Sequence, residues 1–303
     1  MVEGMTAHLM TRPPDARTAS RYGLFGAALG FGAAAAVVCA VFVWTSAGQS
    51  VDRDLLPRAE RGGGYEQTTG LVAPAKTVLE SFGDTATLLT LVGAVLLTGI
   101  ASGRARAGVA GVLVFLGSAG LARALKPMIE RPDFGLLGST THNSFPSGHV
   151  AAAAGLLVGL LVAVPARMRG LVAVPGAAGV SVIAAATMVA GWHRLSDVVA
   201  AVLLAAALGC LAVAVLRPAT EPYRVSDAAN WLAAVLMLPL SLAPVVYAGV
   251  LAPGPAPLLI AMSVAGAVVT ATTLVLVHVL GSAGARAEPA RGRSAAAASG
   301  TRP

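Results

Sequence analysis

Charged residues are scarce in this chain. Of its 303 residues only 12% are charged, whereas soluble domains carry about 25%. With 56% hydrophobic residues and a mean hydropathy of +0.77, the composition excludes an ordinary soluble domain and predicts an integral membrane protein. The net charge of +7 gives no argument for a nucleic-acid partner, because membrane proteins collect Lys and Arg on their cytoplasmic side.

Cysteine is scarce too, and only Cys39 and Cys210 are present. Both lie inside apolar runs, where cysteine behaves as a small buried hydrophobe. We therefore expect neither a disulfide nor a cysteine metal site. Lysine is rarer than arginine, while Ala, Val and Gly are abundant, which indicates a high-GC genome and hence a bacterial source.

Long apolar runs, by contrast, are plentiful. A membrane span needs about 20 residues, and eight runs are predicted to cross a bilayer: residues 23–44, 85–101, 107–125, 147–164, 171–192, 198–216, 231–250 and 258–280. The predicted fold class is all-α, a multi-pass transmembrane helical bundle of about eight spans. Residues 49–84 are predicted to form a charged loop between the first two spans.

The runs divide the chain into four parts. Residues 1–21 precede the first span, 22–217 hold six spans, 228–280 form a C-terminal two-helix hairpin, and 281–303 are predicted to be a disordered tail. Most of the 21 Lys and Arg residues fall in segments that are cytoplasmic if both termini are. The positive-inside rule therefore predicts cytoplasmic termini in a cell membrane. For the hairpin, homo-oligomer formation, lateral substrate access and partner binding are alternatives.

The chemically distinctive stretch is residues 143–149, directly ahead of the fourth span. Pro146 is preorganised for a helix entrance, and Ser147 can cap free backbone N–H groups. A helix N-terminus favours an anion, and Gly148 lets that anion approach the backbone closely. His149 can exchange a proton near neutral pH. The stretch indicates a phosphate-handling site, with a capped helix and a buried histidine as the alternative.

The predicted topology brings further ionisable residues to the same membrane face. The third span ends near Lys126 and Arg131, and the sixth begins beside His193 and Asp197. His193 and Asp197 are four positions apart, so on a helical first turn the carboxylate can hold one ring nitrogen. Taken singly, Asp197 fits an N-cap and His193 an interfacial residue. The two cations likewise fit lipid headgroup contacts. Together the four describe an oxyanion site with acid–base chemistry.

Three motifs in this region resemble those of the type 2 phosphatidic acid phosphatase superfamily, which also includes soluble acid phosphatases and vanadium haloperoxidases. They are Lys126 with Arg131-Pro132, then Pro146-Ser147-Gly148-His149, then His193 with Asp197. The resemblance covers residues 23–216 by arrangement and 126–197 by motif. It implies a six-helix core with the motifs at its third to sixth helices, and a bacterial membrane lipid phosphatase.

The resemblance also implies a role for each residue. His193 would be the nucleophile that takes the phosphoryl group as a phosphohistidine, held by Asp197. His149 would protonate the leaving oxygen and later activate water. Lys126, Ser147 and the backbone of Gly148 would hold the phosphate oxygens. Neither a metal nor another cofactor is expected.

Two positions depart from the family pattern. The pattern places an Arg-Pro pair seven positions after its lysine, where this chain has Asp133, and a Ser-Arg pair before its second histidine, where this chain has Ala186-Thr187. Each lost charge-assisted contact costs about 1.5–3 kcal/mol. Arg131 and Arg194 are the candidates to replace the two arginines. Arg131 is the better one, since Arg194 has lipid headgroups as an alternative target.

The sequence thus predicts a hydrolase acting on a lipid phosphate or diphosphate, such as phosphatidate, phosphatidylglycerophosphate or a polyprenyl diphosphate. Its active site would face the extracytoplasmic side of the membrane. A phosphotransferase is an enzymatic variant of this prediction. The alternatives from other classes are a non-catalytic lipid-phosphate binder or transporter that retains the pocket, and an unrelated channel or transporter. The last is disfavoured, because the spans hold few polar residues beyond Thr and Ser.

Overall fold

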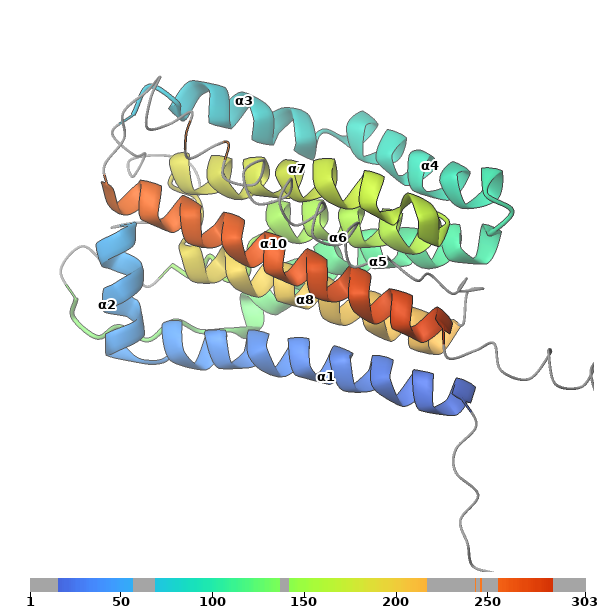
Figure 1. The fold of residues 1–303 in the computed structure, drawn as a ribbon. Helices are drawn as coiled ribbons and strands as arrows, with labels where there is room; N and C mark the ends of the chain where they lie inside the picture. The colour runs from blue at the N-terminus through green and yellow to red at the C-terminus, as the bar shows by residue number, and fades with distance from the viewer. Residues whose placement is uncertain are drawn as a thin grey trace, which may run out of the picture.

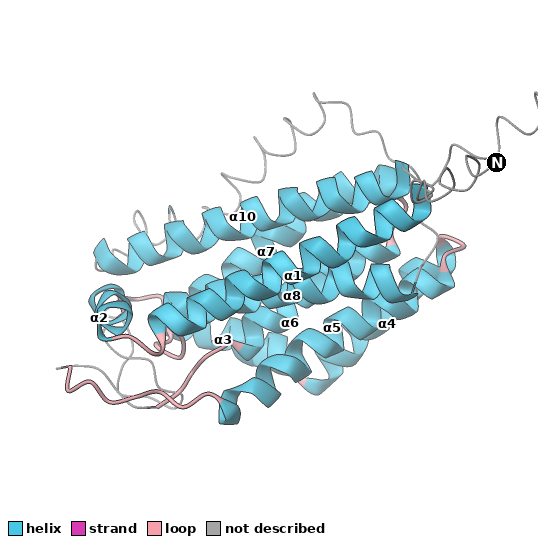
Figure 2. Cartoon of the chain, turned by 90° about the horizontal axis from the view of Figure 1, so that it is seen from below, coloured by secondary structure: helices cyan, strands magenta, loops and turns pink. Residues whose placement is uncertain are grey.

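The computed structural model describes residues 16–56, 69–136, 142–216 and 256–285, together with positions 243 and 246. Every regular element in these residues is helical, so the predicted all-α class is confirmed for them. Figure 1 shows the long helices side by side in an elongated bundle, with the short helix α2 lying across one end. The view turned by 90° places α2 at the same end (Figure 2).

The long helices coincide with predicted apolar runs. They are α1 (Ala16–Phe42), α4 (Thr85–Ala101), α5 (Ala105–Leu125), α6 (Gly148–Ala163), α7 (Arg169–Val189), α8 (Leu195–Leu216) and α10 (Ala256–Ala285). At the two ends of the chain the boundaries differ from the prediction. Helix α1 begins within the predicted N-terminal segment 1–21, and α10 continues past position 280 into the predicted tail. The seventh predicted run, residues 231–250, lies outside the described residues apart from positions 243 and 246.

The described helices include five that are long and apolar enough to cross a membrane, namely α1, α5, α7, α8 and α10. The spans of α5 and α7 each include an adjoining 3-10 turn. A sixth span arises if helices α3 (Val72–Gly83) and α4 count as one, bent by 59° at their junction. Helix α6 is apolar but shorter, because it begins only at Gly148 and Pro165 follows its C-cap at Val164. Multiple apolar helices of this kind are those of an integral membrane protein.

The prediction of a loop over residues 49–84 was wrong for much of its length. Helix α2 (Ser46–Leu55) and helix α3 occupy most of its described part. The hydroxyl of Thr45 caps α2 by accepting a hydrogen bond from the backbone N–H of Gly48 at 3.0 Å. Helix α2 buries the polar side chains of Gln49 and Asp52 and leaves Val51 half exposed. Because this helix buries polar side chains and exposes an apolar one, the usual pattern of buried apolar residues does not predict it.

Helix α6 lies at the centre of the bundle, packed against α4, α5, α7 and α8. Small residues let it approach its neighbours closely. A Cβ atom added to Gly111 of α5 would lie 2.5 Å from the carbonyl oxygen of Gly159 in α6. A Cβ atom added to Gly159 would likewise lie 2.5 Å from the carbonyl oxygen of Gly111. Most of α6 is buried, and this rigid central helix carries the stretch Ser147-Gly148-His149 at its start.

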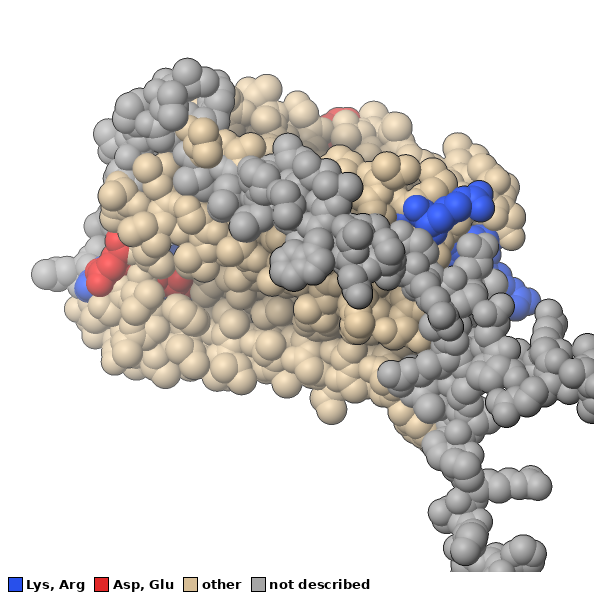
Figure 3. Space-filling model, viewed as in Figure 1, with Lys and Arg blue, Asp and Glu red and all other residues tan. Residues whose placement is uncertain are grey.

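The two ends of the bundle differ in charge. Arg104 lies in the α4–α5 connection and Arg106 in the first turn of α5, while Arg167 lies in the α6–α7 connection and Arg169 begins α7. On the face drawn in Figure 3, most of the visible Lys and Arg side chains lie at this end, opposite to α2. The end of α5, the start of α6, the end of α7 and the start of α8 therefore meet at the other end, where the sequence motifs lie.

Candidate active site

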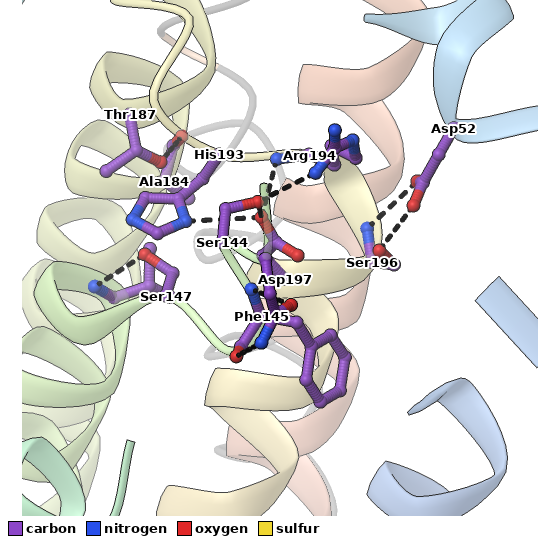
Figure 4. A network of polar contacts seen from close by, with 12 residues as sticks. Asp52, Ser144, Phe145, Ser147, Ala184, Thr187, His193, Arg194, Ser196 and Asp197 are labelled. Atoms are coloured by element: carbon purple, nitrogen blue, oxygen red, sulfur yellow. Dashed lines mark hydrogen bonds and ion pairs between the residues drawn. The ribbon is translucent and has the colours of Figure 1, made fainter. Parts of the chain in front are cut away.

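Asp197 is the centre of a buried polar network in the first turn of α8. One of its carboxylate oxygens, Oδ2, accepts three hydrogen bonds (Figure 4). The donors are Ser144 Oγ at 2.6 Å, the backbone N–H of Arg194 at 2.9 Å and Nδ1 of His193 at 3.2 Å. The bond from Arg194 caps α8, so Asp197 is both a helix cap and the partner of His193.

The contact with Asp197 decides which nitrogen of His193 is available for chemistry. Nδ1 must carry the proton to donate to the carboxylate, which leaves the lone pair on Nε2. In Figure 4 the imidazole of His193 lies between Asp197 and the first turn of α6 at Ser147. Burial lowers the pKa of His193, and the nearby charges of Lys126 and Arg194 lower it further, against the opposing effect of Asp197. A neutral imidazole at neutral pH is the form that acts as a nucleophile.

The turn that presents His193 is built by the end of α7. Gly191 adopts a positive φ of 68°, a conformation that glycine tolerates best. The backbone N–H groups of Trp192 and His193 both donate to the carbonyl oxygen of Thr187, at 3.0 and 3.3 Å. The Thr187 hydroxyl donates to Ala184 of its own helix. Thr187 therefore shapes the turn, and it supplies no cation where the family pattern has arginine.

The start of α6 is fixed against α8. The backbone N–H of Ser147 donates to the carbonyl oxygen of Asp197 at 3.1 Å. The Ser147 hydroxyl accepts from the N–H of Val150 at 3.4 Å, which makes it the helix cap that the sequence predicted. An accepting hydroxyl keeps its own proton to donate. Gly148 follows as the first residue of α6, and a Cβ atom there would meet nothing within 4 Å.

His149 lies at the same end of the bundle as His193. Its ring centroid is 5.7 Å from that of Trp192, with the planes tilted by 40°, and Trp192 directly precedes His193. On another side, a Cβ atom built on Gly83 would lie 3.3 Å from His149 Nε2. The imidazole thus lies between the last residue of α3 and the turn that carries the second histidine.

Arg194 does not reach lipid headgroups, so that alternative was wrong. The residue is 2% exposed, and its Nη1 donates to Ser144 Oγ at 2.9 Å. Its Nη2 is buried and has no partner among the described residues. The reason is local, because the capping bond from its backbone to Asp197 turns the residue into the site.

Arg131 is buried as well, with 6% of its surface exposed. None of its three guanidinium nitrogens has a hydrogen-bond partner within the described part of the chain. Burial, and next the charge of Arg194, lower the pKa of Arg131 to about 10, so it remains a cation at neutral pH. Leaving buried donors unsatisfied is costly, and an oxyanion is the ligand that would satisfy them.

Lys126 begins the 3-10 turn η1 (Lys126–Met128), which continues α5 toward the site. The side chain is half-buried and close enough for its charge to act on His193. Asn143 joins this turn to the second motif, donating through Nδ2 to the carbonyl oxygens of Lys126 at 2.9 Å and Phe145 at 3.1 Å. The structure therefore brings all eight predicted site residues to one end of the bundle, while their roles stay predictions.

Sequence reasoning missed three residues of this network. Asn143 and Ser144 lie in the distinctive stretch 143–149. Their polar side chains just ahead of Pro146 are the sequence signal that could have identified them. Asp52 of α2 accepts hydrogen bonds from Ser196, and both are buried (Figure 4). No motif marks Asp52. The described residues hold no group of three or more His, Cys, Asp or Glu side chains placed to hold a metal ion.

Comparison with known proteins identifies the central part of the chain. The family model of the PAP2 superfamily matches residues 87–221, so the chain contains a PAP2 superfamily domain. This range includes most of α4, all of α5 to α8 and every predicted site residue, while α1, α2, α3 and α10 lie outside it. No curated protein and no solved structure matches the chain.

Proposed function

We propose that this PAP2 domain protein is a bacterial membrane phosphatase that hydrolyses a lipid phosphate or diphosphate through a phosphohistidine on His193. The observation that carries the proposal is the three-donor network on Asp197 Oδ2. It fixes the tautomer of a buried, neutral imidazole beside three cationic side chains. Such a pairing of nucleophile, orienting carboxylate and anion-binding cations is what phosphoryl transfer requires.

In the first step, Nε2 of His193 attacks the phosphorus atom of the substrate. The bond between phosphorus and the leaving oxygen breaks, and protonated His149 donates a proton to that oxygen. The new P–N bond leaves a positive imidazolium, which the carboxylate of Asp197 stabilises. Lys126, Arg131 and Arg194 balance the charge on the phosphoryl oxygens, and the Ser147 hydroxyl and the Gly148 N–H donate to them.

In the second step, water releases the phosphate. His149, now neutral, takes a proton from a water molecule whose oxygen attacks the phosphorus. The P–N bond breaks, and its electron pair returns to Nε2 of His193. Inorganic phosphate leaves with the new oxygen, and both imidazoles regain their starting states.

A lipid substrate is supported by the position of the site. The network lies at the end of apolar helices that are long enough to cross a membrane, where the headgroup of a lipid would lie. The basic residues of the α4–α5 and α6–α7 connections lie at the opposite end. By the positive-inside rule that end is cytoplasmic, so the site would face the extracytoplasmic side.

The test is phosphate release by the purified protein from phosphatidate, phosphatidylglycerophosphate and a polyprenyl diphosphate. We expect His193→Ala to abolish release and His149→Ala to reduce it by about 10²–10⁴-fold, the contribution of a general acid–base group. His278→Ala, an exposed histidine near the far end of α10, is the control and should match the wild type. Equal activity in all four proteins would exclude the mechanism.

A non-catalytic lipid-phosphate binder is the second candidate. It is favoured by Thr187, which gives no cation at a position where the family pattern has arginine. The same assay separates the two functions. Tight binding of a lipid phosphate without turnover in the wild type would favour the binder.

A further inference from the structure

A segment outside the matched domain reaches the candidate site from the N-terminal side. The α2 arm, defined here as residues 43–55, comprises the turn after α1 and helix α2. Gly48 allows the tight return of this arm, because a Cβ atom there would lie 2.1 Å from the carbonyl oxygen of Val41. Helix α2 turns its polar side chains Gln49 and Asp52 inward, and both are 1% exposed.

The first half of the α2 arm holds the loop that carries Arg131. Trp44 Nε1 donates to the carbonyl oxygen of Glu130 at 3.0 Å. Gln49 Nε2 donates to the carbonyl oxygen of Pro132 at 3.0 Å, and also to that of Val43. The two bonds to the loop fall on either side of Arg131 and fix the backbone from which its buried guanidinium extends.

The second half of the arm holds the start of α8. Asp52 accepts a hydrogen bond from the Ser196 hydroxyl at 2.5 Å and another from the Ser196 backbone N–H at 3.3 Å. Ser196 directly precedes Asp197, the partner of His193. The carboxylate of Asp52 therefore fixes the same first turn that orients the nucleophile.

The charges around Asp52 act on its carboxylate in opposite directions, since Asp197 raises its pKa and Arg194 lowers it. Arg131 and Arg194 lie close enough together for each charge to be felt by the other, and Asp52 and Asp197 oppose their repulsion. Helix α10 also packs against α2, and its first turn, 256–260, has no ionisable side chain. Two buried arginines and two buried carboxylates thus form a balanced group.

We propose that Asp52 is a positioning residue of the active site, and that the α2 arm holds Arg131 and the His193–Asp197 pair in their working geometry. This inference rests on the proposed phosphatase function. It assigns the two halves of the arm different tasks. Gln49 supports the phosphate-binding loop, whereas Asp52 supports the nucleophile.

The test uses kinetics of the full-length protein with phosphatidate in detergent micelles, and calorimetry with inorganic phosphate. We expect Asp52→Asn to lower kcat at least about tenfold and to leave KM within about threefold. We expect Gln49→Leu to raise KM and the Kd for inorganic phosphate at least about fivefold, with a smaller change in kcat. General loosening of the fold would change both parameters in both variants.

The pH profile gives a second readout. Burial, followed by the charge of Asp197, raises the pKa of Asp52 to about 6. If its carboxylate is needed, wild-type kcat falls as the pH falls through that value. Asp52→Asn, which is neutral at every pH, should lack this step.

The matched control is Asp54→Asn, the same chemical change on the same helix. Asp54 is 64% exposed at its side chain and, within the described part of the chain, pairs with its neighbour Arg53, so this variant should keep wild-type kinetics. Size-exclusion chromatography and circular dichroism establish that each variant is folded.

Two outcomes would overturn the inference. One is Asp52→Asn with kcat and pH profile equal to the wild type while His193→Ala is inactive, which would leave the phosphatase proposal intact. The other concerns a wild type that releases no phosphate from any lipid tested. The proposed function then fails, and calorimetry with inorganic phosphate tests the role of the arm by itself. Weaker phosphate binding by Gln49→Leu then upholds the role of the arm, and unchanged binding refutes it.

Discussion

At the scale of single residues, the site depends on one carboxylate oxygen. Asp197 Oδ2 accepts from a hydroxyl, an imidazole and a backbone N–H. Ser144 has a second task, since its oxygen accepts from Nη1 of Arg194. This hydroxyl therefore joins a cation that would bind phosphate to the carboxylate that orients the nucleophile. Removing one member of this buried network would leave the groups that it bonds without a partner, which is costly.

Removing the Ser144 hydroxyl should weaken catalysis measurably. Ser144→Ala deletes one hydrogen bond to Asp197 and leaves a buried Arg194 donor unsatisfied, at a cost of about 1–3 kcal/mol. A loss of 1.4 kcal/mol in the transition state lowers the rate about tenfold, so kcat should fall by about that factor. The measurement is phosphate release under saturating substrate. Ser81→Ala on α3, which is exposed, is the control, and a Ser144→Ala protein with wild-type kcat would contradict the prediction.

The arginines show the same dependence on local contacts. Arg131 and Arg194 do not stand at the usual family positions, yet both are buried beside Asp197. The backbone of Arg194 caps α8, and the loop of Arg131 is held by Trp44 and Gln49. Each arginine is thus placed by hydrogen bonds of the backbone around it.

At the scale of helices, close packing of α5 and α6 places the second motif. Gly111 and Gly159 face each other so closely that a Cβ on either would overlap the backbone of the other. Neither backbone can move without shifting α6, which carries His149. Glycine normally weakens a helix, and its presence here is explained by the short distance between the two helices.

Because of this packing, two glycine substitutions on α5 should change the free energy of unfolding in opposite directions. Gly111→Ala should lower the free energy of unfolding by about 1–3 kcal/mol, the cost of overpacking, despite the better helix propensity of alanine. Gly120→Ala, on the same helix, meets nothing within 4 Å and should raise stability by up to about 1 kcal/mol. The melting temperatures of the two variants in detergent measure the effect. Equal shifts would show that α5 and α6 do not pack as described.

At the scale of the whole molecule, the two ends of the bundle differ in their charged residues. The described arginines of the α4–α5 and α6–α7 connections lie at one end, and α2 with the polar network lies at the other (Figures 1 and 3). From the positive-inside rule we propose that the arginine end lies in the cytoplasm. A phosphatase with this orientation would act on headgroups in the outer leaflet.

Single-cysteine labelling in intact cells tests that orientation. The background is Cys39→Ala with Cys210→Ala, which removes both native thiols. We expect a membrane-impermeant maleimide to label Asp54→Cys at the α2 end and not Arg167→Cys at the other end. Both positions are largely accessible, so both should react once the membrane is permeabilised. Labelling of Arg167→Cys alone in intact cells would reverse the proposed topology.

The sequence by itself determined the membrane class, seven of the helices and the residues at the centre of the site. Apolar runs are long and local, so their helices follow from composition, as for 85–101. The spacing of His193 and Asp197 lies within one helical turn, so their contact is a local property as well. The same locality explains why Ser147 was recognised as a cap.

Only the tertiary structure decided the parts of the site that join segments far apart in the chain. Asp52 meets Ser196 across 144 positions, and Ser144 meets Asp197 across 53. The sequence predicts a loop at α2 because this helix buries polar side chains, and those side chains gain partners only when α8 and the loop of Arg131 pack beside them. Hydrogen bonds between distant segments depend on three-dimensional proximity, which hydropathy and residue spacing do not encode.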